Sequence, residues 1–134
     1  MAKITYIEGV GEAFAQKLKN AGIVTTQALL DSGASAKGRH VLSEKSGISA
    51  KLILQWVNHV DLFRIKGVGE EYADLLEAAG VDTVPELGQR NAENLYQKLI
   101  STNEEKKMVR KLPTQTQVKN WVEQAKQLSR IITY

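Results

Sequence analysis

The chain has 134 residues, of which 43% are hydrophobic and 25% are charged, a composition that excludes a disordered or collagen-like protein. It contains no cysteine, which excludes a disulfide framework, a thiolate zinc site and a cysteine nucleophile, and we therefore expect a cytoplasmic protein. Its formal net charge of +3 permits a polyanionic partner without requiring one.

Neither membrane insertion nor secretion is expected from the sequence. The longest stretch without a charged residue, from Asn20 to Leu30, has eleven residues, whereas a helix that crosses a bilayer needs about 20. Glu8, Gly9 and Gly11 arrive before the apolar segment of a signal peptide has formed. We therefore expect no membrane partner and no signal peptide.

A repeat organises the chain. Residues 7–26, IEGVGEAFAQKLKNAGIVTT, align without gaps on residues 65–84, IKGVGEEYADLLEAAGVDTV, and ten of the twenty positions are identical. A second pair, LQWV at 54–57 and KNWV at 119–122, is related by a shift of 65 residues instead of 58. We therefore expect two similar units, 1–64 and 65–134, packed together, with seven extra residues between the glycines and the tryptophan of the second unit.

Helical spacing of apolar residues predicts three helices in the first copy. The first carries Phe14 and Leu18 and ends at Gly22, the second carries Leu29, and a longer third has Trp56 in its apolar stripe. The expected caps are Thr25 or Thr26 and Ser49, and the expected markers of the loop after the second helix are Gly33 and Gly38.

The second copy repeats this pattern, with Pro85 in the first turn of its second helix. Asn91 and Asn103 are expected to cap two further short helices, and Pro113 is expected to begin the last helix, whose stripe includes Trp121. No segment alternates apolar and polar residues as a half-buried strand would. The sequence therefore predicts an all-α fold of about eight short helices with no sheet.

Both copies contain an apolar residue, any residue, Gly, an apolar residue and Gly, followed by three residues, Ala, two residues and Leu. In IEGVGEAFAQKL and IKGVGEEYADLL this pattern resembles the helix-hairpin-helix motif, in which a tight glycine hairpin joins two antiparallel helices and its backbone N–H groups bind DNA phosphate. SGISAKLILQW, at 46–56, resembles the motif less closely, and the corresponding Leu112–Thr114 has lost the glycine. There is little room for a leading helix before Ile7.

The resemblance implies tandem helix-hairpin-helix units and double-stranded DNA as the partner, contacted without sequence readout. Glycine suits phosphate binding by the backbone, because it adopts unusual backbone angles and leaves no side chain between the backbone and a phosphate. The candidate nucleic-acid-binding residues are Gly9, Val10, Gly11, Gly47, Ile48, Ser49, Lys51, Lys66, Gly67, Val68 and Gly69.

The whole chain also resembles a family of small bacterial proteins catalogued as a domain of unknown function. The resemblance includes the two GVG loops, the GIS loop, WVNHVDLFRIKGVGEEYADLLEAAGVDTV and the late LPT segment. It implies the same tandem architecture and supplies no activity.

The charges leave two functions open. Residues 1–66 carry nine basic and five acidic residues, whereas residues 67–134 carry nine basic and ten acidic ones, which favours the first unit for DNA. Carboxylates at Glu12, Glu70 and Glu71 oppose phosphate at the glycine loops. The alternative is a protein-protein interaction module in which the loops only let helices pack closely.

The tryptophans, the basic cluster and the histidines are expected to serve the fold rather than binding or catalysis. The tryptophans are expected in the core, with base stacking as the alternative. A solvated helix face explains the cluster Lys106, Lys107, Arg110 and Lys111, and a phosphate contact is its alternative. His40 and His59 match no metal-ligand pattern, and GVGEAF and GVGEEY lack the third glycine of a nucleotide fingerprint. We expect no metal, no cofactor, no small-molecule substrate and no enzymatic activity.

Overall fold

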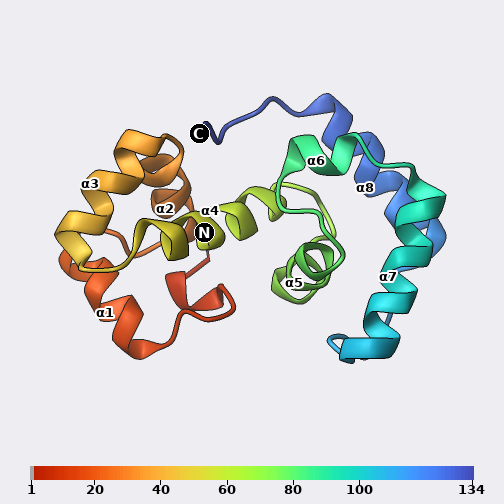
Figure 1. The fold of residues 1–134 in the computed structure, drawn as a ribbon, viewed down its shortest axis with the longest axis horizontal. Helices are drawn as coiled ribbons and strands as arrows, with labels where there is room; N and C mark the ends of the chain where they lie inside the picture. The colour runs from red at the N-terminus through yellow and green to blue at the C-terminus, as the bar shows by residue number, and fades with distance from the viewer. Residues whose placement is uncertain (1) are drawn as a thin grey trace. The chain divides into compact units, whose positions relative to one another are not determined.

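The computed structural model describes residues 2–134, and helices are its main secondary structure (Figure 1). In chain order, the elements are a 3-10 helix η1 (Ile4–Tyr6), α1 (Glu12–Asn20), α2 (Thr26–Gly33), α3 (Ala36–Ser46), α4 (Ala50–Leu62), α5 (Glu70–Ala78), α6 (Val84–Gly88), α7 (Ala92–Lys106) and α8 (Gln115–Gln127). Within residues 2–134, β-pairing is limited to one isolated bridge between Lys3 and Thr25. The predicted all-α fold with about eight helices is confirmed.

The chain divides into two compact units. Unit 1 comprises the chain up to Asp61 together with Ile131–Tyr134, and unit 2 comprises Leu62–Arg130. In unit 1, α3 packs against α1 and α2, and in unit 2, α8 packs against α6 and α7 (Figure 1). The sequence placed the boundary after residue 64 and did not predict that the last four residues return to unit 1.

The backbone of the repeat is nearly the same in both units. Helices α1 and α5 have nine residues each and begin directly after Gly11 and Gly69. Each is preceded by a glycine with positive φ, Gly9 at +89° or Gly67 at +96°, and followed by another at the same offset. A second helix follows in each unit, eight residues long in α2 and five in α6. The prediction of matching loops and helix order is therefore confirmed.

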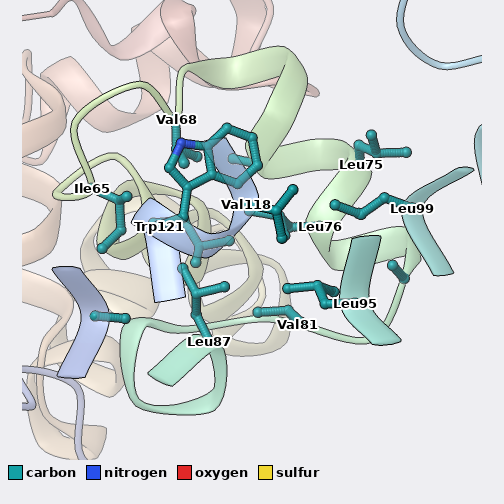
Figure 2. Close-up of a cluster of buried hydrophobic side chains, with 14 of the residues drawn as sticks. Ile65, Val68, Leu75, Leu76, Val81, Leu87, Leu95, Leu99, Val118 and Trp121 are labelled. Carbon is teal, nitrogen blue, oxygen red and sulfur yellow. The ribbon is translucent and has the colours of Figure 1, made fainter. Parts of the chain in front are cut away.

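The two tryptophans occupy equivalent core positions. Each is the seventh residue of a 13-residue helix, α4 or α8, and Trp56 is 2% and Trp121 1% exposed. The Phe14 ring lies 5.1 Å from that of Trp56, and the Tyr72 ring lies 5.3 Å from that of Trp121. Figure 2 shows Trp121 within the core of unit 2. Rings buried to this extent cannot stack on bases, so core packing is the correct interpretation.

The seven additional residues of unit 2 lie mainly around the end of α7. Helix α7 has 15 residues and α3 has 11, and the loop after α7 has eight residues where the loop after α3 has three. The extra length is partly offset by the shorter α6. The insertion thus lengthens α7 by about one turn relative to α3 and also lengthens the loop that follows.

Three expectations about helix ends were wrong. Asn103 caps no new helix, because α7 continues through it to Lys106 in a run of good helix formers. Helix α8 begins at Gln115 instead of Pro113, because Thr114 and Gln117 form a capping box. Gly33 and Gly38 mark no long loop, since Gly33 ends α2 and Gly38 lies inside α3.

Packing explains both of these helical glycines. A Cβ added at residue 33 would lie 2.6 Å from Cγ2 of Val57, and one at residue 38 would collide with the backbone oxygen of Ser32. Ser35 caps α3 by accepting a 3.0 Å hydrogen bond from the N–H of Gly38. Close approach of α2 to α3 and α4 therefore requires glycine at positions that the sequence pattern assigned to a loop.

Candidate nucleic-acid interface

Two loops of the same geometry are the principal candidates for binding, and we call Gly9–Gly11 glycine loop 1 and Gly67–Gly69 glycine loop 2. In each, the N–H of the central valine donates a 3.1 Å hydrogen bond to the carbonyl of the isoleucine three residues earlier. Both valines are 4% exposed, and both isoleucines are 1% exposed. Val10 and Val68 therefore belong to the core, and their backbone N–H groups already have partners.

The first glycine of each loop serves the fold. Gly9 and Gly67 adopt left-handed φ angles that favour glycine. A Cβ at residue 67 would lie 3.0 Å from Nε1 of Trp121, and one at residue 9 would lie 3.6 Å from Nε1 of Trp56. The backbone angle explains the glycine at both positions, and tight packing is a further reason at residue 67.

The backbone angles of the second glycine of each loop do not require glycine. Gly11 has φ −87° and ψ −171°, and Gly69 has φ −93° and ψ −168°, which are extended angles that any residue adopts. A Cβ at residue 11 would meet no atom within 4 Å. The fold therefore does not explain the glycine at this position.

Gly11 and Gly69 are the N-cap residues of α1 and α5, and these two helices have no side-chain cap. The side chains that cap the other helices of eight or more residues are Thr25 on α2, Ser35 on α3, Ser49 on α4, Asn91 on α7 and Thr114 on α8. The first N–H groups of a helix have no partner within it, and the helix dipole favours an anion beside them. Each glycine loop therefore presents a helix N-terminus that no capping side chain covers.

Serine should affect the free energy of unfolding differently at the first and at the second glycine of a loop. We expect Gly11→Ser to leave the free energy of unfolding unchanged or raise it by a few tenths of a kcal/mol, because serine is a good N-cap residue. Gly67→Ser should lower it by about 1–3 kcal/mol, because serine is strained at positive φ. Urea denaturation of both variants measures the difference. A large loss of stability in Gly11→Ser would show that the fold requires this glycine.

The GIS loop between α3 and α4 differs from the glycine loops. Gly47, with φ +75°, is the C-cap of α3, and Ile48 is 3% exposed. Ser49 accepts a 3.2 Å hydrogen bond from the N–H of Leu52 and so caps α4. Lys51 follows and is exposed. Because the serine hydroxyl already serves the helix N-terminus, this loop offers a phosphate less than the glycine loops do.

Charged groups of both signs surround the loops. Glu12, Glu70 and Glu71 lie in the first turns of α1 and α5, where a carboxylate stabilises a helix by about 0.3–1 kcal/mol. Lys66 has an exposed side chain, and its backbone exchanges hydrogen bonds of 2.9 and 3.1 Å with Gln124 of α8. This exchange, which the sequence did not predict, anchors glycine loop 2.

The structure also brings a basic segment to α5. The Tyr72 hydroxyl donates a 2.9 Å hydrogen bond to the backbone oxygen of Lys111. The sequence favoured a helix face for Lys111, and the structure places it in the loop between α7 and α8. The only sequence signal was that this cationic cluster falls within the seven-residue insertion.

Comparison with known proteins identifies a family whose description assigns no activity. The family described as "Domain of unknown function (DUF4332)" matches residues 8–128. No curated protein and no solved structure matches the chain. Among residues 2–134, no helix combines the length and apolar character needed to cross a bilayer.

Proposed function

We propose that this chain, which belongs to the family described as "Domain of unknown function (DUF4332)", binds double-stranded DNA through its backbone phosphates and without sequence readout. The proposed contacts are the N–H groups at the N-termini of α1 and α5, reached across glycine loops 1 and 2. The observation that carries the proposal is the second glycine of each loop, which neither backbone angle nor, at Gly11, packing requires.

An uncapped helix N-terminus behind a glycine suits a phosphate for two reasons. The N–H groups and the helix dipole attract an anion, and the missing side chain lets a phosphate oxygen approach the backbone. The same arrangement occurs twice in one chain with matching angles. The resemblance of both loops to the helix-hairpin-helix motif supports the same ligand.

The proposal implies weak binding that depends on salt. Backbone contacts to a few phosphates carry no sequence information, so the dissociation constant should be about 10⁻⁴ to 10⁻⁶ M at physiological salt. Carboxylates in the first turns of α1 and α5 weaken the attraction further. We propose a binding protein instead of an enzyme, and the absence of cysteine supports a cytoplasmic location.

Titration of a labelled duplex at about 50 and 200 mM salt tests the proposal. Wild-type protein should bind at the lower salt, and its affinity should fall steeply at the higher salt. The double variant Gly11→Asp/Gly69→Asp should bind at least about tenfold more weakly, because aspartate caps the helix and its charge repels phosphate.

The matched control is Gly11→Ser/Gly69→Ser, which caps the same N–H groups without adding charge. It should bind more tightly than the aspartate variant and more weakly than wild type. Wild-type protein that shows no salt-sensitive binding would disprove the DNA proposal. So would an aspartate variant that stays folded and binds as wild type does.

A protein-protein interaction module is the second candidate. Glu12, Glu70 and Glu71 favour it, because they place negative charge at the helix ends that a phosphate would approach. Tyr6 and Val24 of unit 1 are also 46% and 52% exposed, although large apolar side chains usually prefer the core. On this view the glycine loops are purely structural.

A further inference from the structure

The loop between α7 and α8 carries the densest group of positive charges in the chain. We call residues 106–111, which are the last residue of α7 and the first five residues of the loop, the basic loop, and its cations are Lys106, Lys107, Arg110 and Lys111. All four are exposed. Unit 1 has only the three-residue GIS loop at the corresponding place, so the basic loop belongs to the insertion that distinguishes unit 2.

The basic loop is held in one conformation by Asn103 and by the core. Oδ1 of Asn103 accepts hydrogen bonds from the N–H groups of Met108, at 2.8 Å, and Val109, at 2.9 Å, and its Nδ2 donates to the Val109 oxygen at 3.1 Å. Val109 is 8% exposed, and Met108 and Leu112 pack against the core of unit 2. Cations on this loop are therefore presented from a fixed backbone.

The same backbone lies next to the helix that follows glycine loop 2. Tyr72 stands three residues after Gly69, in the first turn of α5, and its ring packs against Trp121. Its hydroxyl reaches the Lys111 oxygen at 2.9 Å. Side chains of a helix lean toward its N-terminus, so this contact places the basic loop beside the uncapped end of α5.

Lys107 has a backbone conformation that costs energy. With φ 50° and ψ 50°, it is the one residue other than glycine with positive φ in the part of the chain that the structure describes. The corresponding C-cap position of α3 holds Gly47, for which that conformation is unstrained. Strain of this kind is often retained at functional sites.

We propose that the basic loop supplies the side-chain part of a phosphate-binding site in unit 2, where it and glycine loop 2 contact the backbone of one DNA duplex. This inference rests on the proposed function. Its cations offset Glu70 and Glu71 at the N-terminus of α5, whereas unit 1 has no insertion of this kind. Glu104 and Glu105 precede the loop on α7 and are outnumbered by its four cations. Unit 2 is then the tighter site, although the charge count by halves favoured the first unit.

Duplex titrations with three variants test the inference. Arg110→Gln/Lys111→Gln should lower affinity about tenfold or more at low salt and should reduce the slope of log affinity against log salt by about 2. The control Lys98→Gln/Lys119→Gln removes the same charge from exposed positions of unit 2 outside the loop and should change affinity less than threefold.

Lys107→Gly gives an independent signature. It should raise the melting temperature by about 3 °C, because strain is relieved, while it lowers DNA affinity. A merely structural role for this residue would not move the two measurements in opposite directions.

Failure of the inference and failure of the proposed function are distinguishable. If wild type binds and the loop and control variants weaken binding equally, the basic loop is not a phosphate site. In that case Gly69→Asp decides the role of glycine loop 2, which binds phosphate only if this variant weakens binding. If the loop variants weaken binding and Gly69→Asp does not, the basic loop binds phosphate by itself, and both the glycine-loop proposal and the joint site are wrong. If wild type binds no duplex at low salt, both are wrong.

Discussion

Truncation of either buried tryptophan to alanine is expected to lower the free energy of unfolding by about 3–5 kcal/mol. Trp56 and Trp121 fill equivalent positions, and each packs its ring against an aromatic residue of α1 or α5. Figure 2 shows that Val68, Leu87 and Val118 surround Trp121, so alanine would leave a cavity between the glycine loop, α6 and α8. Domains of this size are stable by about 5–15 kcal/mol, and the loss is therefore a large fraction of the total.

Urea denaturation monitored by far-ultraviolet circular dichroism measures the effect. Trp121→Phe is the matched control, because phenylalanine keeps an apolar ring and should cost clearly less than alanine. It also provides a measurement if the alanine variant does not fold. An unchanged denaturation midpoint in Trp56→Ala or Trp121→Ala would contradict the equivalence of the two core positions.

The sequence predicts the repeated part of the fold well, because short-range features of the chain determine that part. Positive φ at Gly9 and Gly67 and the helical spacing of apolar residues in α1 and α5 are short-range features. A shift of 65 between the tryptophans also located the insertion before the structure showed it in α7 and the basic loop.

Helix α3 illustrates what short-range patterns miss. It contains Gly38, a poor helix former, and its position 39 is a buried arginine where an amphipathic helix usually has an apolar residue. Gly38 is required by the nearby backbone of Ser32, and Arg39 is satisfied partly by Thr133, which is 94 positions away in the chain. Contacts at such separations leave no periodic signal in the sequence.

The candidate site shows the same limit. The glycine pattern identified the loops, but it did not separate Gly9, which the fold needs, from Gly11, which it does not. Charge counts along the chain favoured the first half. They could not show that Tyr72 binds the backbone of Lys111 and so brings the cations of a distant loop to α5.

Loss of the Arg39 guanidinium is expected to lower the free energy of unfolding by about 3 kcal/mol, because it leaves one buried and two partly buried carbonyl groups without their charged donor. Arg39 is 5% exposed. Its Nη1 donates to the oxygens of Gly33, at 2.8 Å, and Ala34, at 3.1 Å, and its Nη2 donates to the Thr133 oxygen at 2.7 Å. One guanidinium therefore joins the junction of α2 and α3 to the last residues of the chain.

Arg39→Met keeps the apolar stem and removes all three hydrogen bonds, and it should release Ile131–Tyr134 as well as destabilise unit 1. Urea denaturation measures the loss of stability, and hydrogen exchange at the Thr133 amide, which donates to the Ala34 oxygen at 2.8 Å, measures the release of the chain end. Arg39→Lys should recover little of the loss, because an ammonium cannot reproduce the planar fork that reaches separate carbonyls. Thr133→Ala should change stability by less than about 0.5 kcal/mol, because this residue is exposed and its backbone makes the hydrogen bonds. Wild-type exchange at Thr133 in Arg39→Met would show that other contacts, such as the buried Ile132, hold the end of the chain without Arg39.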